Sequence, residues 1–261
     1  MDELSQKLPE SIGLYAGKMG VALYWLHYAR VYADEMREDN AIILIEEIQA
    51  TIHSDTPFRY ADGLAGTGSA LCYLFREGFI DPPADDFFSE LDNYFYYKVF
   101  FGDHADLSHA TGLIGIGYYL LNRIQDIPTN DYMSLQLRCS LLLIQDALFA
   151  ALGMNGYTYP FLQPEPLSES VMADMKRFLN KMLQTGLCPA LTRKALDIIG
   201  VAFHSESSVF AELEDAHTNN DMHSFQRLLK SIAEWPEDKP AKHLAALQMQ
   251  DMSLPAWWKL F

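Results

Sequence analysis

Apolar residues are spaced helically along almost the whole chain. Between residues 21 and 31 they recur every three or four positions, which predicts a helix. A second apolar run over residues 41–48 predicts a helix capped by Asp39 or Asn40. The aromatic segment 87–101 combines high β-propensity with helical spacing, and we interpret it as a helix. Strand-type alternation between hairpin turns is missing elsewhere, so the pattern predicts an all-α fold.

A short glycine motif of the form G-x-x-G recurs ahead of three helical runs. The three pairs are Gly17 and Gly20, Gly63 and Gly66, and Gly112 and Gly115. The first glycines are 46 and 49 residues apart, a length that holds two helices and their loops. A glycine costs about 1 kcal/mol of helix propensity relative to alanine. Three such pairs therefore indicate that a second backbone packs closely against each motif.

The motifs also suggest how the chain is organised. Residues 1–152 hold three predicted helical-hairpin repeats, and the glycine- and proline-rich segment 153–170 predicts a loop. Residues 171–261 predict further helices without the glycine motif, over 171–184, 191–203, 209–217, 224–234 and 241–250. We expect this C-terminal segment to pack on the repeats within one structural domain.

The motif residues resemble the repeats of the lanthionine synthetase C-like (LanC-like) family. The matching stretches are residues 13–20, 61–66 and 112–115, which read GLYAGKMG, ADGLAG and GLIG. This resemblance implies an α/α toroid, two concentric rings of helices with the repeat glycines at the starts of the inner helices. Its specific part covers roughly residues 13–125, so it predicts an incomplete α/α barrel of helical hairpins. Family members that are cyclases use zinc, held by two cysteines and a histidine, to add a peptide thiol to a dehydrated serine or threonine.

The zinc ligands of the family are not recognisable in this sequence. The family's adjacent Cys-His pair is missing, because Cys72, Cys139 and Cys188 are each followed by another residue type. A catalytic zinc needs three protein ligands around an open fourth position. The missing ligands therefore predict no metal, no other cofactor and no cyclase activity. The resemblance leaves a non-catalytic role in peptide modification, with a peptide or a peptide-modifying enzyme as partner.

Acidic residues before the predicted inner helices are the other candidates for chemistry. Asp62, Asp103 and Asp106 precede helix starts and, with His109, are predicted to lie at the mouth of the toroid. Helical toroids also host glycoside hydrolases, which use two carboxyl groups about 5–9 Å apart, and this is the alternative function. The same aspartates also suit helix N-termini, where they meet free N–H groups and the helix dipole. The segment 103–109 has metal-ligating residue types, but spacing alone fixes no metal geometry.

Charge and cysteine usage narrow the class of partner and the compartment. The chain has 19 basic and 35 acidic residues, a formal net charge of −16, which disfavours nucleic acids and anionic membranes. Three isolated cysteines suit a reducing compartment, and the first residues lack the apolar region of a secretory signal. We therefore expect a cytoplasmic protein that does not span a membrane. Like charges oppose self-association, so we expect a monomer or a weak homodimer.

Overall fold

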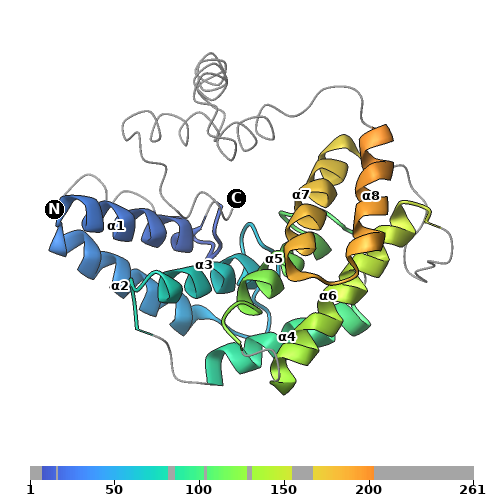
Figure 1. Ribbon diagram of the computed structural model, residues 1–261. Helices are drawn as coiled ribbons and strands as arrows, with labels where there is room; N and C mark the ends of the chain where they lie inside the picture. Colours follow the sequence, from blue (N-terminus) through green and yellow to red (C-terminus); the bar gives the residue numbers. More distant parts are fainter. Residues whose placement is uncertain are drawn as a thin grey trace, which may run out of the picture. The chain divides into compact units, whose positions relative to one another are not determined.

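The structure is a computed structural model that describes residues 8–15, 17–81, 86–102, 105–127, 131–154 and 167–202. Within these residues it contains eight α-helices and no β-strand, which confirms the predicted all-α fold for this part of the chain (Figure 1). The helices are α1 (Lys18–Tyr32), α2 (Glu35–Thr51), α3 (Leu64–Arg76), α4 (Asp86–Phe101), α5 (Leu113–Arg123), α6 (Tyr132–Ala151), α7 (Glu169–Thr185) and α8 (Pro189–Ala202). The chain divides into two compact units, Met1–Ile199 and Gly200–Phe261, and these helices lie in the first apart from the end of α8.

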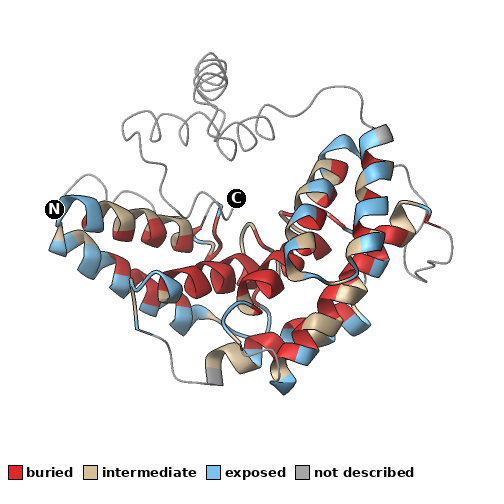
Figure 2. Ribbon diagram, viewed as in Figure 1, coloured by how far each residue is buried: buried red, intermediate tan, exposed pale blue. Residues whose placement is uncertain are grey.

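The odd-numbered helices form a row in which each contacts the next. Helix α1 packs on α3, α3 packs on α5 and α5 packs on α7, while α4 and α6 pack on each other and on α5. Helices α3 and α5 are buried along nearly their whole length, as the red ribbons in Figure 2 show. The row therefore has a fourth member, α7, beyond the three that the glycine motifs predicted.

The three glycine motifs build the same local structure three times. The first residue of each helix, Lys18, Leu64 or Leu113, donates its backbone N–H to the carbonyl seven residues earlier, at 2.8, 2.8 and 2.9 Å. A Cβ on the second glycine of each motif would lie 1.9–2.4 Å from the carbonyl oxygen six residues earlier. These pairs are Gly20 with Leu14, Gly66 with Tyr60, and Gly115 with His109. The second glycine is thus required because each loop lies directly against the helix that it precedes.

A third glycine in two of these helices receives an aromatic ring from the next helix of the row. A Cβ on Gly68 would lie 2.6 Å from the ring of Tyr119 in α5, and one on Gly117 would lie 2.5 Å from the ring of Phe178 in α7. Both rings are fully buried. Helix α7 therefore packs on α5 in the way that α5 packs on α3, although α7 has no glycine motif of its own.

A buried ion pair fixes α4 against α5. The carboxylate of Asp92 is fully buried, lies 3.1 Å from Nε of Arg123 and accepts a 2.5 Å hydrogen bond from the hydroxyl of Tyr119. Burial raises the pKa of Asp92, while the hydrogen bond from Tyr119 and the charge of Arg123 oppose that rise. Removing one member of such a pair leaves an uncompensated buried charge.

The second helix begins earlier than the sequence predicted. It starts at Glu35, after Asp34, whose side chain accepts a backbone N–H at 3.1 Å. The preceding helix ends at Ala33 in a left-handed conformation, with φ of 53°. The first turns of α2 are largely exposed and so carry no apolar periodicity. The predicted caps, Asp39 and Asn40, lie inside the helix, and that prediction was wrong.

The other helix predictions are confirmed as far as the described residues extend. The aromatic segment forms α4, and α7 and α8 cover the segments predicted over 171–184 and 191–203, with α8 ending at residue 202. The helices predicted after residue 203, and most of the loop predicted over 153–170, lie outside the described residues. None of the helices in the described part has the length and apolar character that a membrane crossing requires.

Candidate functional site

The loops that precede α1, α3 and α5 are joined side by side through their backbones. The N–H of Tyr15 donates to the carbonyl of Ala61 at 2.9 Å, and the N–H of Ala61 donates to the carbonyl of Ala110 at 2.9 Å. Each of these residues lies two positions before the first glycine of its motif. The repeat therefore places equivalent loop residues next to one another, and side chains at the same motif position come together from distant parts of the sequence.

His109 occupies a repeat position that holds Leu14 and Tyr60 in the first two motifs. The backbone carbonyl of His109 lies against Gly115, just as the carbonyls of Leu14 and Tyr60 lie against the second glycines of their own motifs. The residue is only 5% exposed. Its imidazole is surrounded by aromatic rings, with centroids 4.5 Å away at Tyr60, 4.3 Å at Tyr118 and 5.8 Å at Tyr15. A polar side chain thus replaces an apolar or aromatic one in the third of the three motif loops.

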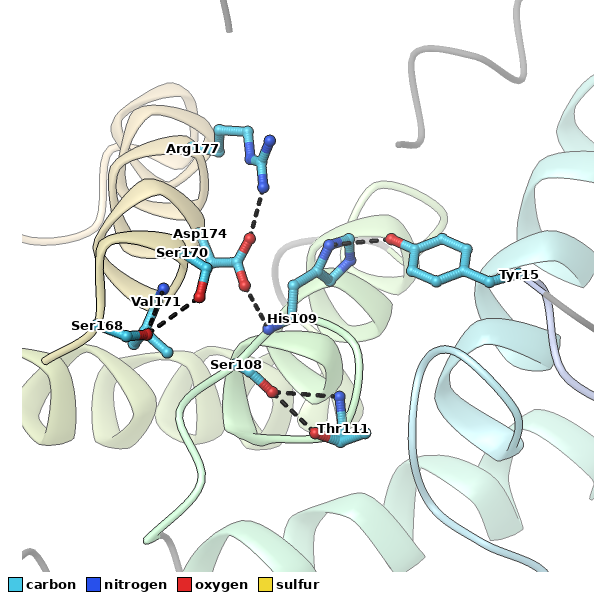
Figure 3. Close-up of polar contacts among 9 residues, drawn as sticks. All are labelled: Tyr15, Ser108, His109, Thr111, Ser168, Ser170, Val171, Asp174 and Arg177. Atoms are coloured by element: carbon cyan, nitrogen blue, oxygen red, sulfur yellow. Dashed lines mark hydrogen bonds and ion pairs between the residues drawn. The ribbon is translucent and has the colours of Figure 1, made fainter. Parts of the chain in front are cut away.

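Hydrogen bonds connect His109 to the first loop and to α7 (Figure 3). The hydroxyl of Tyr15 lies 3.1 Å from Nδ1 of the imidazole. On the other side, the backbone N–H of His109 donates to Oδ2 of Asp174 at 2.9 Å, and Oδ1 of Asp174 pairs with Arg177 at 2.5 Å. We call Tyr15, His109, Asp174 and Arg177 the loop-end cluster. It joins the loop before α1, the loop before α5 and helix α7.

The surroundings of His109 keep its imidazole neutral. Burial lowers its pKa to about 3, and the positive charges of Arg177 and Lys181 act in the same direction. Burial also raises the pKa of Tyr15, with smaller contributions from the phenols of Tyr60 and Tyr118. Near neutral pH the pair is therefore a neutral phenol bound to a neutral imidazole. An imidazole with such a low pKa is a weak general base.

One nitrogen of this imidazole has no hydrogen-bond partner. Nε2 of His109 is buried, and nothing among the described residues hydrogen-bonds to it. Buried polar atoms are normally paired, and leaving one unpaired costs about 1–3 kcal/mol. Tyr15, the partner of His109 from the first loop, is 43% exposed. The cluster thus combines a half-exposed tyrosine with a buried polar atom that none of the described residues satisfies.

The other residues predicted at the toroid mouth are bound within their own loops. The carboxylate of Asp62 pairs with Arg59 at 2.5 Å. Asp106 accepts hydrogen bonds from the N–H of Ser108 at 2.8 Å and the hydroxyl of Thr111 at 2.6 Å. Burial tends to raise the pKa of Asp106, but these hydrogen bonds outweigh it and the net shift is downward. Asp103 lies outside the described residues.

Sequence reasoning found His109 but missed its partners. Tyr15 is 94 residues away and Asp174 is 65 residues away along the chain. The position of Tyr15, two residues before its first glycine, was the available indication, because Ala61 and Ala110 hold the same position. Nothing in the sequence of α7 connects Asp174 to the loops, since that helix has no glycine motif.

The donors in the described residues do not fit the zinc site that the family resemblance implies. No three histidine, cysteine or acidic side chains of this part of the chain lie close enough to hold an ion together. Cys72 is buried in α3, where burial raises the pKa of its thiol, Cys139 is partly buried in α6 and Cys188 is exposed before α8. A cysteine must be a thiolate to bind zinc, and a buried thiol with a raised pKa is unsuited to that role.

Comparison of the chain with protein-family models, with curated proteins and with solved structures finds no match. The resemblance to the LanC-like family therefore depends on the repeat residues of the sequence alone.

Proposed function

We propose that the protein is a LanC-like helical-repeat protein that binds a peptide at the loop-end cluster and carries out no zinc chemistry. In this proposal the row α1, α3, α5 and α7 is the inner part of an α/α toroid, and the protein acts in the cytoplasm during peptide modification. The partner is the peptide itself or an enzyme that modifies it. Three equivalent loops and a fourth helix packed in the same way support the helical-repeat part of this proposal.

The observation that carries the binding role is the contact between Tyr15 and His109. It brings together two loops from distant repeats and leaves Tyr15 43% exposed beside a buried imidazole. Aromatic side chains with a polar end are frequent anchors in protein–peptide recognition. The low pKa of His109, caused first by burial, makes proton transfer at neutral pH inefficient. These properties favour recognition over acid–base catalysis.

The hydrolase alternative finds less support in the same region. A glycosidase needs two carboxyl groups that face the scissile bond from opposite sides. Asp62 and Asp106 instead bind groups of their own loops, and Asp174 is held by Arg177 and by the backbone of His109. We therefore retain peptide binding as the single proposed function.

Selection of random displayed 12-residue peptides on the immobilised full chain tests this role. Enriched peptides should bind the wild type and lose at least ten-fold in affinity with Tyr15→Ala, because this change removes the exposed ring. Tyr15→Phe separates the ring from its hydrogen bond to His109, and Tyr32→Ala removes a ring that is 60% exposed at the far end of α1. If no peptide is enriched, or if Tyr15→Ala and Tyr32→Ala behave alike, the loop-end cluster is not a peptide site.

A further inference from the structure

The last two turns of α4 expose an aromatic surface. On one side of this helix, Leu91, Phe95 and Val99 are buried against its neighbours. On the opposite side the exposed residues of these turns are Tyr94, Tyr97, Phe100 and Phe101, which we call the α4 aromatic face. Phe101 is 75% exposed and Tyr97 is 61% exposed. The helix is therefore apolar on both sides, whereas a helix with one partner side is normally polar on the other.

Contacts among these rings hold the surface in one arrangement. The rings of Tyr97 and Phe101 are stacked, with centroids 6.1 Å apart and planes at 22°. Phe100 packs on Tyr96 with centroids 4.4 Å apart. With roughly 200 Å² for a fully exposed aromatic residue, the exposed fractions amount to about 400 Å². This is the size of the largest apolar patch on a typical monomeric protein, about 300–600 Å², and such patches are often functional.

Two more exposed apolar side chains lie in the first turn of α6, a neighbour of α4. Figure 1 shows α4 and α6 side by side, and the amide of Gln136 donates to the side chain of Asn93 at 3.0 Å. This bond places the start of α6 beside the middle of α4. Tyr132 and Leu135, in that first turn, are 79% and 58% exposed.

Charge identifies the kind of partner that this surface fits. Glu90 is exposed on the same side of α4, one turn before Tyr94, and Asp131 is exposed at the N-cap of α6. The chain as a whole carries −16 and so attracts basic partners and repels a second copy of itself. Cations already bind aromatic faces elsewhere in this protein, with Arg30 lying 3.3 Å from the centre of the Phe79 ring. Exposed rings beside carboxylates suit lysine and arginine in the same way.

The size of the surface limits the partner to a short segment. A standard protein–protein interface buries about 800 Å² on each partner. The α4 aromatic face offers about half of that area, which matches one side of a short helix. We propose that the α4 aromatic face docks a basic amphipathic helix of a partner protein, with apolar side chains on Phe100 and Phe101 and lysine or arginine on Tyr97 and Glu90. This proposal concerns a second surface and does not depend on peptide binding at the loop-end cluster.

Two designed helical peptides of 18 residues test the proposal on the full chain. One carries leucine on one side and lysine on the other, and its counterpart has glutamate in place of lysine. Fluorescence anisotropy should show micromolar binding of the lysine peptide that weakens as salt increases, and no binding of the glutamate peptide. The double variant Tyr97→Ser/Phe101→Ser should lose at least ten-fold in affinity, and Glu90→Gln should lose several-fold.

The matched control is Val31→Ser/Tyr32→Ser, which removes two side chains that are 61% and 60% exposed at the end of α1. This control should bind the lysine peptide like the wild type. Equal losses in both double variants, equal binding of the two peptides, or no binding would each overturn the proposal. Sedimentation provides a further check: a wild-type dimer that Tyr97→Ser/Phe101→Ser dissociates would show that a second copy, and not a basic helix, occupies this face.

Discussion

Replacing His109 with leucine should remove a specific sensitivity of the fold to acid. Leucine is chosen because Leu14 holds the same position in the first repeat, with its carbonyl against Gly20 as that of His109 lies against Gly115. The variant loses the hydrogen bond to Tyr15 and also removes the unpaired Nε2. These changes have opposite signs and are each worth about 1 kcal/mol or somewhat more, so the net effect near neutral pH should be small.

The acid effect follows from the pKa of His109 in the two states. Burial, and then the charges of Arg177 and Lys181, lower that pKa from 6.5 to about 3 in the folded chain. Between these values the unfolded chain binds a proton that the folded chain does not, so stability falls as pH falls. The loss is about 1.4 kcal/mol for each pH unit below the unfolded pKa. At pH 5 the wild type should therefore have lost about 2 kcal/mol of its free energy of unfolding, and His109→Leu should not show this loss.

Urea unfolding at pH 7.5 and pH 5 measures this difference. The free energy of unfolding of the wild type minus that of His109→Leu should decrease by about 2 kcal/mol between the two pH values. Subtracting the same difference for His53→Leu, in which the lost histidine is exposed, corrects for the change in composition. A difference that stays constant within about 0.5 kcal/mol would show that His109 is protonated in the folded state, and our account of the cluster would be wrong.

Three further predictions concern the frame around the cluster. Gly115→Ala should destabilise the fold by about 1–3 kcal/mol, because its Cβ would lie 2.4 Å from a backbone oxygen. Gly200→Ala, where a Cβ meets no atom within 4 Å, should instead stabilise the fold by about 0.5–1 kcal/mol. Thermal melting distinguishes the two variants, and equal melting temperatures would contradict the close packing at Gly115. Asp92→Leu should lower the free energy of unfolding by about 3–5 kcal/mol, because it leaves the charge of Arg123 buried without its partner. Adding Arg123→Leu should recover much of that loss in urea unfolding. A double variant no more stable than Asp92→Leu alone would count against the ion pair. Elemental analysis should find no stoichiometric zinc in the purified full chain, and about one zinc per chain would revive a cyclase.

The sequence predicted the helices whose apolar face is regular and missed features that depend on exposed or distant residues. The apolar runs after the second and third glycine motifs became α3 and α5, which are buried on nearly every side, and the helically spaced aromatic segment became α4. The start of α2 was missed because its first turns are exposed and α1 ends at Ala33 without the glycine that usually marks a left-handed cap. Apolar periodicity in a sequence reflects burial, so the exposed start of a helix cannot be recognised from it.

The fourth helix of the row, α7, was not recognised because it contributes an aromatic ring to the contact and not a glycine. Gly117 of α5 supplies the space, and Phe178 of α7 supplies the ring that fills it. A search for repeated glycines therefore finds the helix that supplies the glycine but not the helix that supplies the ring. The same limit applies to the cluster, since Asp174 reaches His109 through a helix that no motif connects to the loops. His109 itself was found from the sequence because it lies just before a predicted inner helix, in the segment 103–109 that has metal-ligating residue types.

The most direct test of a binding role without chemistry is a thiol assay on a linear peptide that contains one cysteine and one dehydroalanine. The peptide, labelled with a fluorophore, is mixed with the full chain with and without added zinc, and anisotropy and free thiol are followed in the same sample. We predict that anisotropy increases, that Tyr15→Ala abolishes the increase, and that the amount of free thiol stays at the level of the peptide alone. Loss of thiol faster than in the peptide alone, dependent on zinc and on the protein, would show that the chain closes thioether rings and would contradict our account.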